Sequence, residues 1–129
     1  MGWHKIKRRP ADAVLSEIVR RKESRCAFQV TPNCKLRGGE RHWRDLHACH
    51  FIGRRNESTR FDFDNVDAGC PMCHKYMDEH KNFFRGWKQN QLGIRKYNKL
   101  IARSLMLTKK DDKLTMLRLK PMLDELRNT

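Results

Sequence analysis

Two cysteine pairs, in a chain with few other means of building a core, restrict the fold more than any other feature. The pairs are Cys26 with Cys34 and Cys70 with Cys73. Charged residues make up 34% of the 129 residues, and the mean hydropathy is −0.89. A single domain with so small a core usually needs a metal ion or disulfides to stabilise it.

We expect these cysteines to bind a metal rather than to form disulfides. The sequence begins without an apolar segment of the secretory kind and has no run of 18 apolar residues, which favours a cytoplasmic protein with reduced thiols. Four thiolates suit tetrahedral Zn²⁺, and two distant pairs can close a small fold around one structural ion. Reduced, buried cysteines without a metal are the alternative, because Cys26 and Cys34 are spaced more widely than CxxC.

The charge of the chain favours a polyanionic partner. Lysine and arginine total 29 against 15 aspartates and glutamates, a formal net charge of +14. Each contact between such a cation and a phosphate releases a counterion, which favours binding to nucleic acid. A merely soluble basic surface, an acidic partner protein or a ribosome would also fit this charge. Residues 1–10 are predicted to be a basic N-terminal arm, either a solvated tail or a phosphate contact.

The stretch 46–74 has the pattern of two strands followed by a helix. A first strand is predicted over 46–52, a polar loop over 53–60 and a short second strand over 61–66, where aromatic and acidic residues alternate. Pro71 suits the first position of the helix that follows. The sequence therefore predicts a ββα unit.

Three residues of this unit have the order His, Asn, His of a one-metal nuclease site. His50 lies on the first predicted strand, Asn65 ends the second, and His74 lies in the first turn of the helix. A lone histidine on a strand or an asparagine at a strand end is more often structural, so the interpretation depends on all three. His47 shares the strand of His50, and because side chains alternate, a bulge or bend would be needed to present both together.

The loop between the predicted strands carries Arg54 and Arg55 and is closed by Arg60. Guanidinium groups bind phosphates through paired hydrogen bonds. We therefore predict that these three arginines contact nucleic acid. A solvated loop without a ligand is the alternative.

The chain resembles the NinG (Rap) family of phage recombination proteins, a branch of the HNH, or ββα-metal, nucleases. The resemblance is carried by three segments: HACHFIGRR at 47–55, TRFDFDNVDAGCPMC at 59–73 and FFRGW at 83–87. The helix with IVRRK at 18–22 and the C-terminal helices also sit where that family has helices. The resemblance covers roughly residues 11–127, and its specific motifs lie in 47–74.

This resemblance implies a metal-dependent, structure-selective DNA endonuclease acting on branched recombination intermediates. His50 would be the general base that activates water, Asn65 would orient the site, and His74 would ligate a catalytic Mg²⁺ or Mn²⁺. His47 is a candidate second ligand. Many HNH enzymes have an aspartate just before the base, where this chain has Cys49, and a thiolate is a poor ligand for Mg²⁺. Cys49 is thus the odd thiol, either a core residue or a fifth sulfur that exchanges into the zinc set.

The rest of the chain predicts helices on both sides of this unit. Apolar residues at helical spacing predict one helix over 11–23 and another over 75–92. Residues 93–129 form a predicted C-terminal helical extension, in which Pro121 should kink or split the last helix. These helices could dock on the nuclease unit, pair between protomers or bind DNA, and the sequence does not choose.

Together these patterns predict an α+β fold with a small zinc-stabilised ββα-metal core, HNH-type and treble-clef-like, over 11–92 and flanked by helices. The expected protein is a phage DNA endonuclease acting in the host cytoplasm on branched DNA, without membrane association and with a homodimer left open. A zinc-stabilised nucleic-acid-binding module without catalysis is the first alternative. A basic interaction or ribosome-associated protein is the second.

Overall fold

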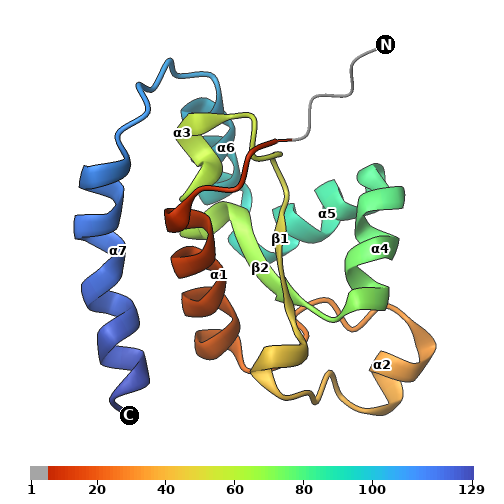
Figure 1. The fold of residues 1–129 in the computed structure, drawn as a ribbon. Helices are drawn as coiled ribbons and strands as arrows, with labels where there is room; N and C mark the ends of the chain where they lie inside the picture. The colour runs from red at the N-terminus through yellow and green to blue at the C-terminus, as the bar shows by residue number, and fades with distance from the viewer. Residues whose placement is uncertain (1–5) are drawn as a thin grey trace.

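The computed structural model describes residues 6–129 and shows an α+β fold, which confirms the predicted class (Figure 1). The helices are α1 (Pro10–Glu23), α2 (Pro32–Leu36), α3 (Glu57–Arg60), α4 (Pro71–Glu79), α5 (Lys81–Leu92), α6 (Ile94–Ser104) and α7 (Asp112–Arg127). Two short 3₁₀ helices span Trp43–Asp45 and Phe63–Asn65. The strands are β1 (His47–His50) and β2 (Val66–Gly69).

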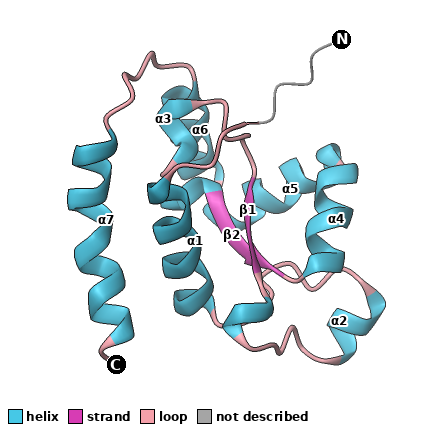
Figure 2. Cartoon of the chain, in the orientation of Figure 1, coloured by secondary structure: helices cyan, strands magenta, loops and turns pink. Residues whose placement is uncertain are grey.

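The two strands form an antiparallel sheet between helices (Figure 2). Residue His47 pairs with Gly69 and His50 with Val66, without a bulge. Helix α1 packs against both strands, and α4 follows β2 and contacts β1. Along the chain, α3 and the second 3₁₀ helix lie between the two strands, and α4 begins directly after β2.

The predicted second strand over 61–66 is wrong in its position. The side chain of Asp62 accepts a hydrogen bond from the backbone N–H of Asp64 at 3.0 Å, and the chain turns through a 3₁₀ helix there. Strand β2 begins only at Val66, once the chain can pair with β1. Local side-chain capping thus overrides the alternation of aromatic and acidic residues. The predicted loop 53–60 also ends in a helix, α3.

One core joins nearly all of these elements. Its buried apolar side chains come from α1, both strands, α4, α5 and α7: Leu15, Ile18, Cys49, Val66, Ala68, Met77, Phe84, Leu119 and Leu123. The ring of Phe28 packs edge-to-face on Phe84 and Trp87, with centroids 5.5 and 4.6 Å away. This ring also fills the space beside Gly69, where an added Cβ would lie 2.6 Å from it. A side chain at Gly69, the residue before Cys70, would therefore displace Phe28.

The C-terminal helices dock on the rest of the chain. Leu119 and Leu123 of α7 are buried against α1, and Arg127 forms an ion pair with Glu17 of α1 at 2.7 Å. Helix α7 continues through Pro121 and is not split. The predicted helix over 75–92 is instead two helices, α4 and α5, separated at His80, which has φ −125° and ψ 70°.

Part of the predicted N-terminal arm belongs to the fold, and part lies outside the described residues. Residues 1–5 are not described. Arg9 is only 7% exposed, and its guanidinium forms ion pairs with Glu57 and Asp112. Within residues 6–129, the structure contains no helix with the length and apolar character needed to cross a membrane.

Candidate functional site

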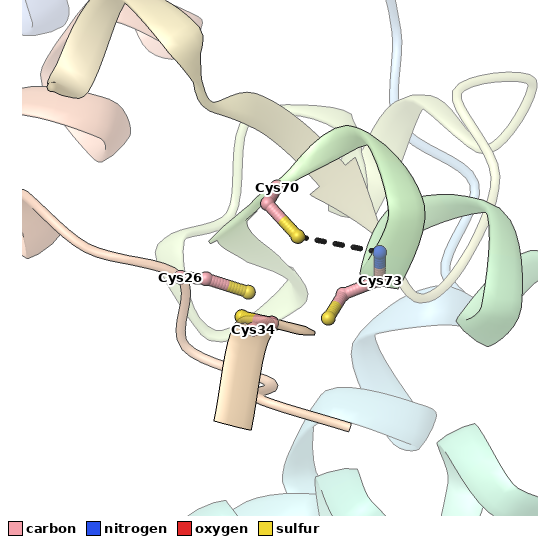
Figure 3. A group of neighbouring side chains, drawn as sticks. All are labelled: Cys26, Cys34, Cys70 and Cys73. Carbon is pink, nitrogen blue, oxygen red and sulfur yellow. Dashed lines mark hydrogen bonds between the residues drawn. The ribbon is translucent and has the colours of Figure 1, made fainter. Parts of the chain in front are cut away.

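Four cysteines that are distant in the sequence converge on one point (Figure 3). Cys26 follows α1, Cys34 lies on α2, and Cys70 and Cys73 belong to the first turn of α4. All four are buried, and their sulfur atoms lie within 4.8 Å of one another. Four sulfurs around one Zn²⁺ at about 2.3 Å would be about 3.8 Å apart. The predicted cluster is therefore confirmed, and its donor set can hold a metal ion.

Local electrostatics make this four-cysteine cluster costly to ionise without a cation. Burial raises the pKa of Cys34, and the neighbouring Cys26 and Cys73 raise it further. Burial also raises the pKa of Cys70. Burial would raise the pKa of Cys73 too, but hydrogen bonds from Thr31 and from the backbone lower it to about 7. One thiolate is thus stabilised by the protein, and further thiolates would need a bound cation to balance their charge.

Cys49, the odd thiol, is a core residue and does not join the cluster. It is 0% exposed, pairs with Asp67 across the sheet, and its thiol donates to the carbonyl of His47 at 3.5 Å. Burial raises its pKa well above the ordinary range. A neutral thiol held in the core is a poor ligand for a hard cation such as Mg²⁺.

Three histidines line a second feature, a cavity of about 850 Å³ whose lining residues come largely from α1, β1 and α4. His47 and His50 are the first and last residues of β1, and His74 lies in the first turn of α4. The bulge expected to bring His47 and His50 together is not present in β1. Both residues nevertheless line the cavity, which runs along this four-residue strand.

His47 and His74 meet at the spacing of two ligands of one metal ion. Their Nδ1 atoms are 3.1 Å apart. Two nitrogens bound to one ion at about 2.1 Å, at a right angle, would be about 3.0 Å apart. The Nε2 of His74 lies 3.2 Å from a carboxylate oxygen of Asp78, one helical turn further along α4. A carboxylate in this place fixes the ring so that Nδ1 keeps its lone pair for a metal.

The environment of His50 suits a base. Its Nε2 lies 3.0 Å from the backbone carbonyl of Arg60, which can only accept a hydrogen bond. Nε2 therefore carries the proton, and Nδ1 keeps its lone pair. Burial lowers the pKa of His50 from its ordinary value, and the cation of Arg54 lowers it further. The ring is consequently neutral near pH 7, as a general base requires.

The side chain of Asn65 holds both ends of the segment 52–59, which precedes the carbonyl of Arg60. This side chain is fully buried, accepts a hydrogen bond from the N–H of Ile52 at 2.7 Å, and donates to the carbonyls of Ile52 at 2.9 Å and Thr59 at 3.1 Å. These bonds join the end of β1 to α3. Asn65 thus positions the backbone around His50.

The three arginines predicted to bind nucleic acid do not act together. Arg60 is 6% exposed and points inward, with Asp12 accepting two hydrogen bonds from its guanidinium at 2.6 and 2.9 Å. The prediction that Arg60 grips a phosphate is therefore wrong, because its guanidinium is already paired inside the fold. Arg54 lines the cavity, and Arg55 is exposed outside the cavity wall.

The structure adds cations that the sequence pattern did not reveal. Arg8, Arg20, Arg44 and Lys81 line the cavity together with Arg54. Only the positions of α1 and of the turn Trp43–Asp45 relative to β1 bring these cations to the histidines. The one available signal was the four-residue spacing of Arg8, Asp12, Ser16 and Arg20, all of which line the cavity.

Comparison of the chain with models of known protein families, with curated proteins and with solved structures gives no match.

Proposed function

We propose that this protein is a metal-dependent DNA endonuclease of the HNH type. The observation that carries the proposal is that one cavity, lined by five cations, contains both a histidine with a free Nδ1 and two further histidines at metal-ligand spacing. The sequence resemblance to the NinG family supports the same chemistry and favours branched DNA as the substrate.

Each histidine then has a defined part in phosphodiester hydrolysis. His50 takes the proton of the attacking water on Nδ1, while Nε2 stays hydrogen-bonded to the carbonyl of Arg60. His47 and His74 would hold the divalent cation through their Nδ1 atoms. When bound, such a cation polarises the scissile phosphate and stabilises the leaving oxygen.

The surrounding residues hold this arrangement in place. Asn65 fixes the backbone on either side of His50. The cations around the cavity attract the phosphate backbone and offset its charge. We further propose that the four-cysteine cluster binds one structural Zn²⁺, which fastens the start of α4 and so positions His74 next to Cys73.

The test is cleavage of labelled single strands, duplexes, forks and four-way junctions in Mg²⁺, Mn²⁺ or EDTA. The variant His50→Ala should lose at least about 100-fold in rate, the lower end for a general base. His80→Ala is the matched control, because His80 is exposed and lies outside the cavity. Cleavage that persists in His50→Ala would refute the assignment of the base.

A non-catalytic, zinc-stabilised DNA-binding module is the second candidate. The observation that favours it is the buried Cys49, which leaves the catalytic centre without the acid that many HNH enzymes have before the base. Tight DNA binding without cleavage in either cation would support this second function and refute the first.

A further inference from the structure

We propose that Arg20 and Arg44, held against Trp43, form a separate binding site for a backbone phosphate of the nucleic acid, at the end of the cavity away from His50. This inference rests on the proposed function, since it takes the strand in the cavity to be the substrate. It concerns a phosphate that is bound but not cleaved.

The tryptophan organises the cations of this end. The guanidinium of Arg44 lies 4.8 Å from the centroid of the Trp43 ring, and those of Arg20 and Arg21 lie 5.2 and 4.2 Å from it. Contacts of this kind between a cation and the face of an aromatic ring are stabilising. Trp43 therefore holds three like charges together on one surface, which their mutual repulsion would otherwise oppose.

The charge of the two site arginines is only partly balanced inside the protein, because the carboxylate of Glu17 attracts Arg20 without forming an ion pair with it. Within residues 6–129, neither Arg20 nor Arg44 forms an ion pair with a carboxylate, and the nearby Glu17 is paired with Arg21 and Arg127. Burial lowers the pKa of Arg20, the carboxylate of Glu17 offsets part of this, and the neighbouring Arg8 and Arg21 lower the pKa further. A phosphate bound at this point would supply the missing negative charge.

The carboxylates of the cavity wall are also occupied. Asp12 is paired with Arg60, and Asp78 with His74 and Lys81. At this end, the cavity wall therefore has cations without an ion pair and no free carboxylate. Both features favour the binding of an anionic ligand. Planar guanidinium groups bind phosphate oxygens through paired hydrogen bonds, which makes a phosphate the ligand that fits.

The distance along α1 separates this phosphate from the one at the catalytic centre. Arg20 is eight residues beyond Asp12, about 12 Å along the helix. Asp12 holds Arg60, and the carbonyl of Arg60 holds His50. A site at Arg20 thus lies about three to four nucleotide steps of 3.4 Å from Asp12 along the helix axis. A strand bound at both ends would lie along β1, past His47 and His74.

The experiment measures duplex binding over a range of salt concentrations, without a chelator and without added Mg²⁺ or Mn²⁺, so that cleavage is not required and the proposed structural ion stays in place. Removing one phosphate contact should reduce the slope of log affinity against log salt by about 0.9. We expect this reduction for Arg44→Ala and for Arg20→Ala. Trp43→Phe, which leaves the charge unchanged, should weaken binding several-fold, because phenylalanine holds cations less well than tryptophan. The matched control is Lys99→Ala, an exposed cation on α6 outside the cavity.

The outcomes separate this inference from the proposed function. Slopes that are unchanged in Arg44→Ala and Arg20→Ala but lower in Lys99→Ala would place the DNA on α6 and overturn the inference. Unchanged slopes in all three variants would also overturn it. Both results would leave the nuclease activity standing if cleavage is observed. Absence of any DNA binding by the wild-type protein would instead refute the proposed function, and RNA bound in its place would change the substrate while keeping the phosphate site.

Discussion

Replacing Arg60 should destabilise the protein, and it should do so without removing a contact to DNA. The guanidinium of Arg60 donates to both carboxylate oxygens of Asp12, to the carbonyl of Arg54 at 3.2 Å and to that of Lys7 at 2.9 Å. Both members of the ion pair are 6% exposed. In Arg60→Ala the carboxylate of Asp12 keeps only its hydrogen bond from the backbone N–H of Arg9.

The expected magnitude follows from the burial of this pair. Breaking a buried ion pair by removing one partner costs about 3–5 kcal/mol, most of it from the charge left unpaired. That is a large share of the about 5–15 kcal/mol by which most domains are stable. Replacing both partners, as in Arg60→Met with Asp12→Leu, should recover much of the loss, because an apolar pair of similar volume leaves no buried charge.

Urea denaturation of the metal-loaded protein measures this free energy of unfolding, and DNA binding over a range of salt concentrations provides the comparison. We expect Arg60→Ala to lower the urea midpoint strongly and to leave the salt slope of the folded protein unchanged. Arg54→Ala, which alters a cavity residue, should do the reverse. A stable Arg60→Ala protein with a reduced salt slope would refute the reasoning and restore Arg60 as a phosphate contact.

Three further predictions follow from buried charge and from the two metal sites. Burial and the nearby Asp67 raise the pKa of Glu23 to about 7, above its unfolded value near 4.5. The stability gained from the proton on Glu23 is therefore complete below pH 4.5 and is lost as the pH rises through 7. Glu23→Gln should therefore be more stable than wild type at pH 8 and not at pH 4.5. Urea titrations that give the same difference in unfolding free energy between variant and wild type at both pH values would contradict this. Elemental analysis should find about one zinc per chain, and a chelator should unfold the protein, whereas a chelator-treated protein with an unchanged circular dichroism spectrum would argue against a structural ion. Asp78→Ala should weaken Mn²⁺ binding, measured by electron paramagnetic resonance, by about 10–100-fold, while the neighbouring Glu79→Ala should bind Mn²⁺ as wild type does.

The sequence predicted the features that depend on neighbouring residues. Apolar residues at helical spacing placed α1 to within one residue of its start at Pro10. The pair CxxC followed by a helix located α4 and half of the four-cysteine cluster. These predictions hold because the hydrogen bonds within a helix and the spacing along it are set by residues close in the chain.

Local patterns failed where a side chain's role depends on a distant segment. Arg60 looks like a surface cation in a polar loop, and only the packing of α1 against α3 and the sheet turns it into the buried partner of Asp12. Cys49 had two interpretations, and the sheet register decided between them by placing it in the core opposite Asp67. The second strand likewise begins later than predicted, because the side chain of Asp62 caps a 3₁₀ helix. The alternation of aromatic and acidic residues gives no sign of this cap.

The candidate site divides along the same line. The sequence by itself determined which side chains have the chemistry for metal binding and proton transfer, namely His47, His50 and His74 with the cysteines. Only the tertiary structure decided that two of these histidines meet at 3.1 Å, that burial lowers the pKa of the third, and that the cations facing them come from α1 and from the turn at Trp43. The physical reason is that the identity of a side chain fixes what it can bind, whereas its pKa and its partners are set by burial and by charges brought in from remote parts of the chain.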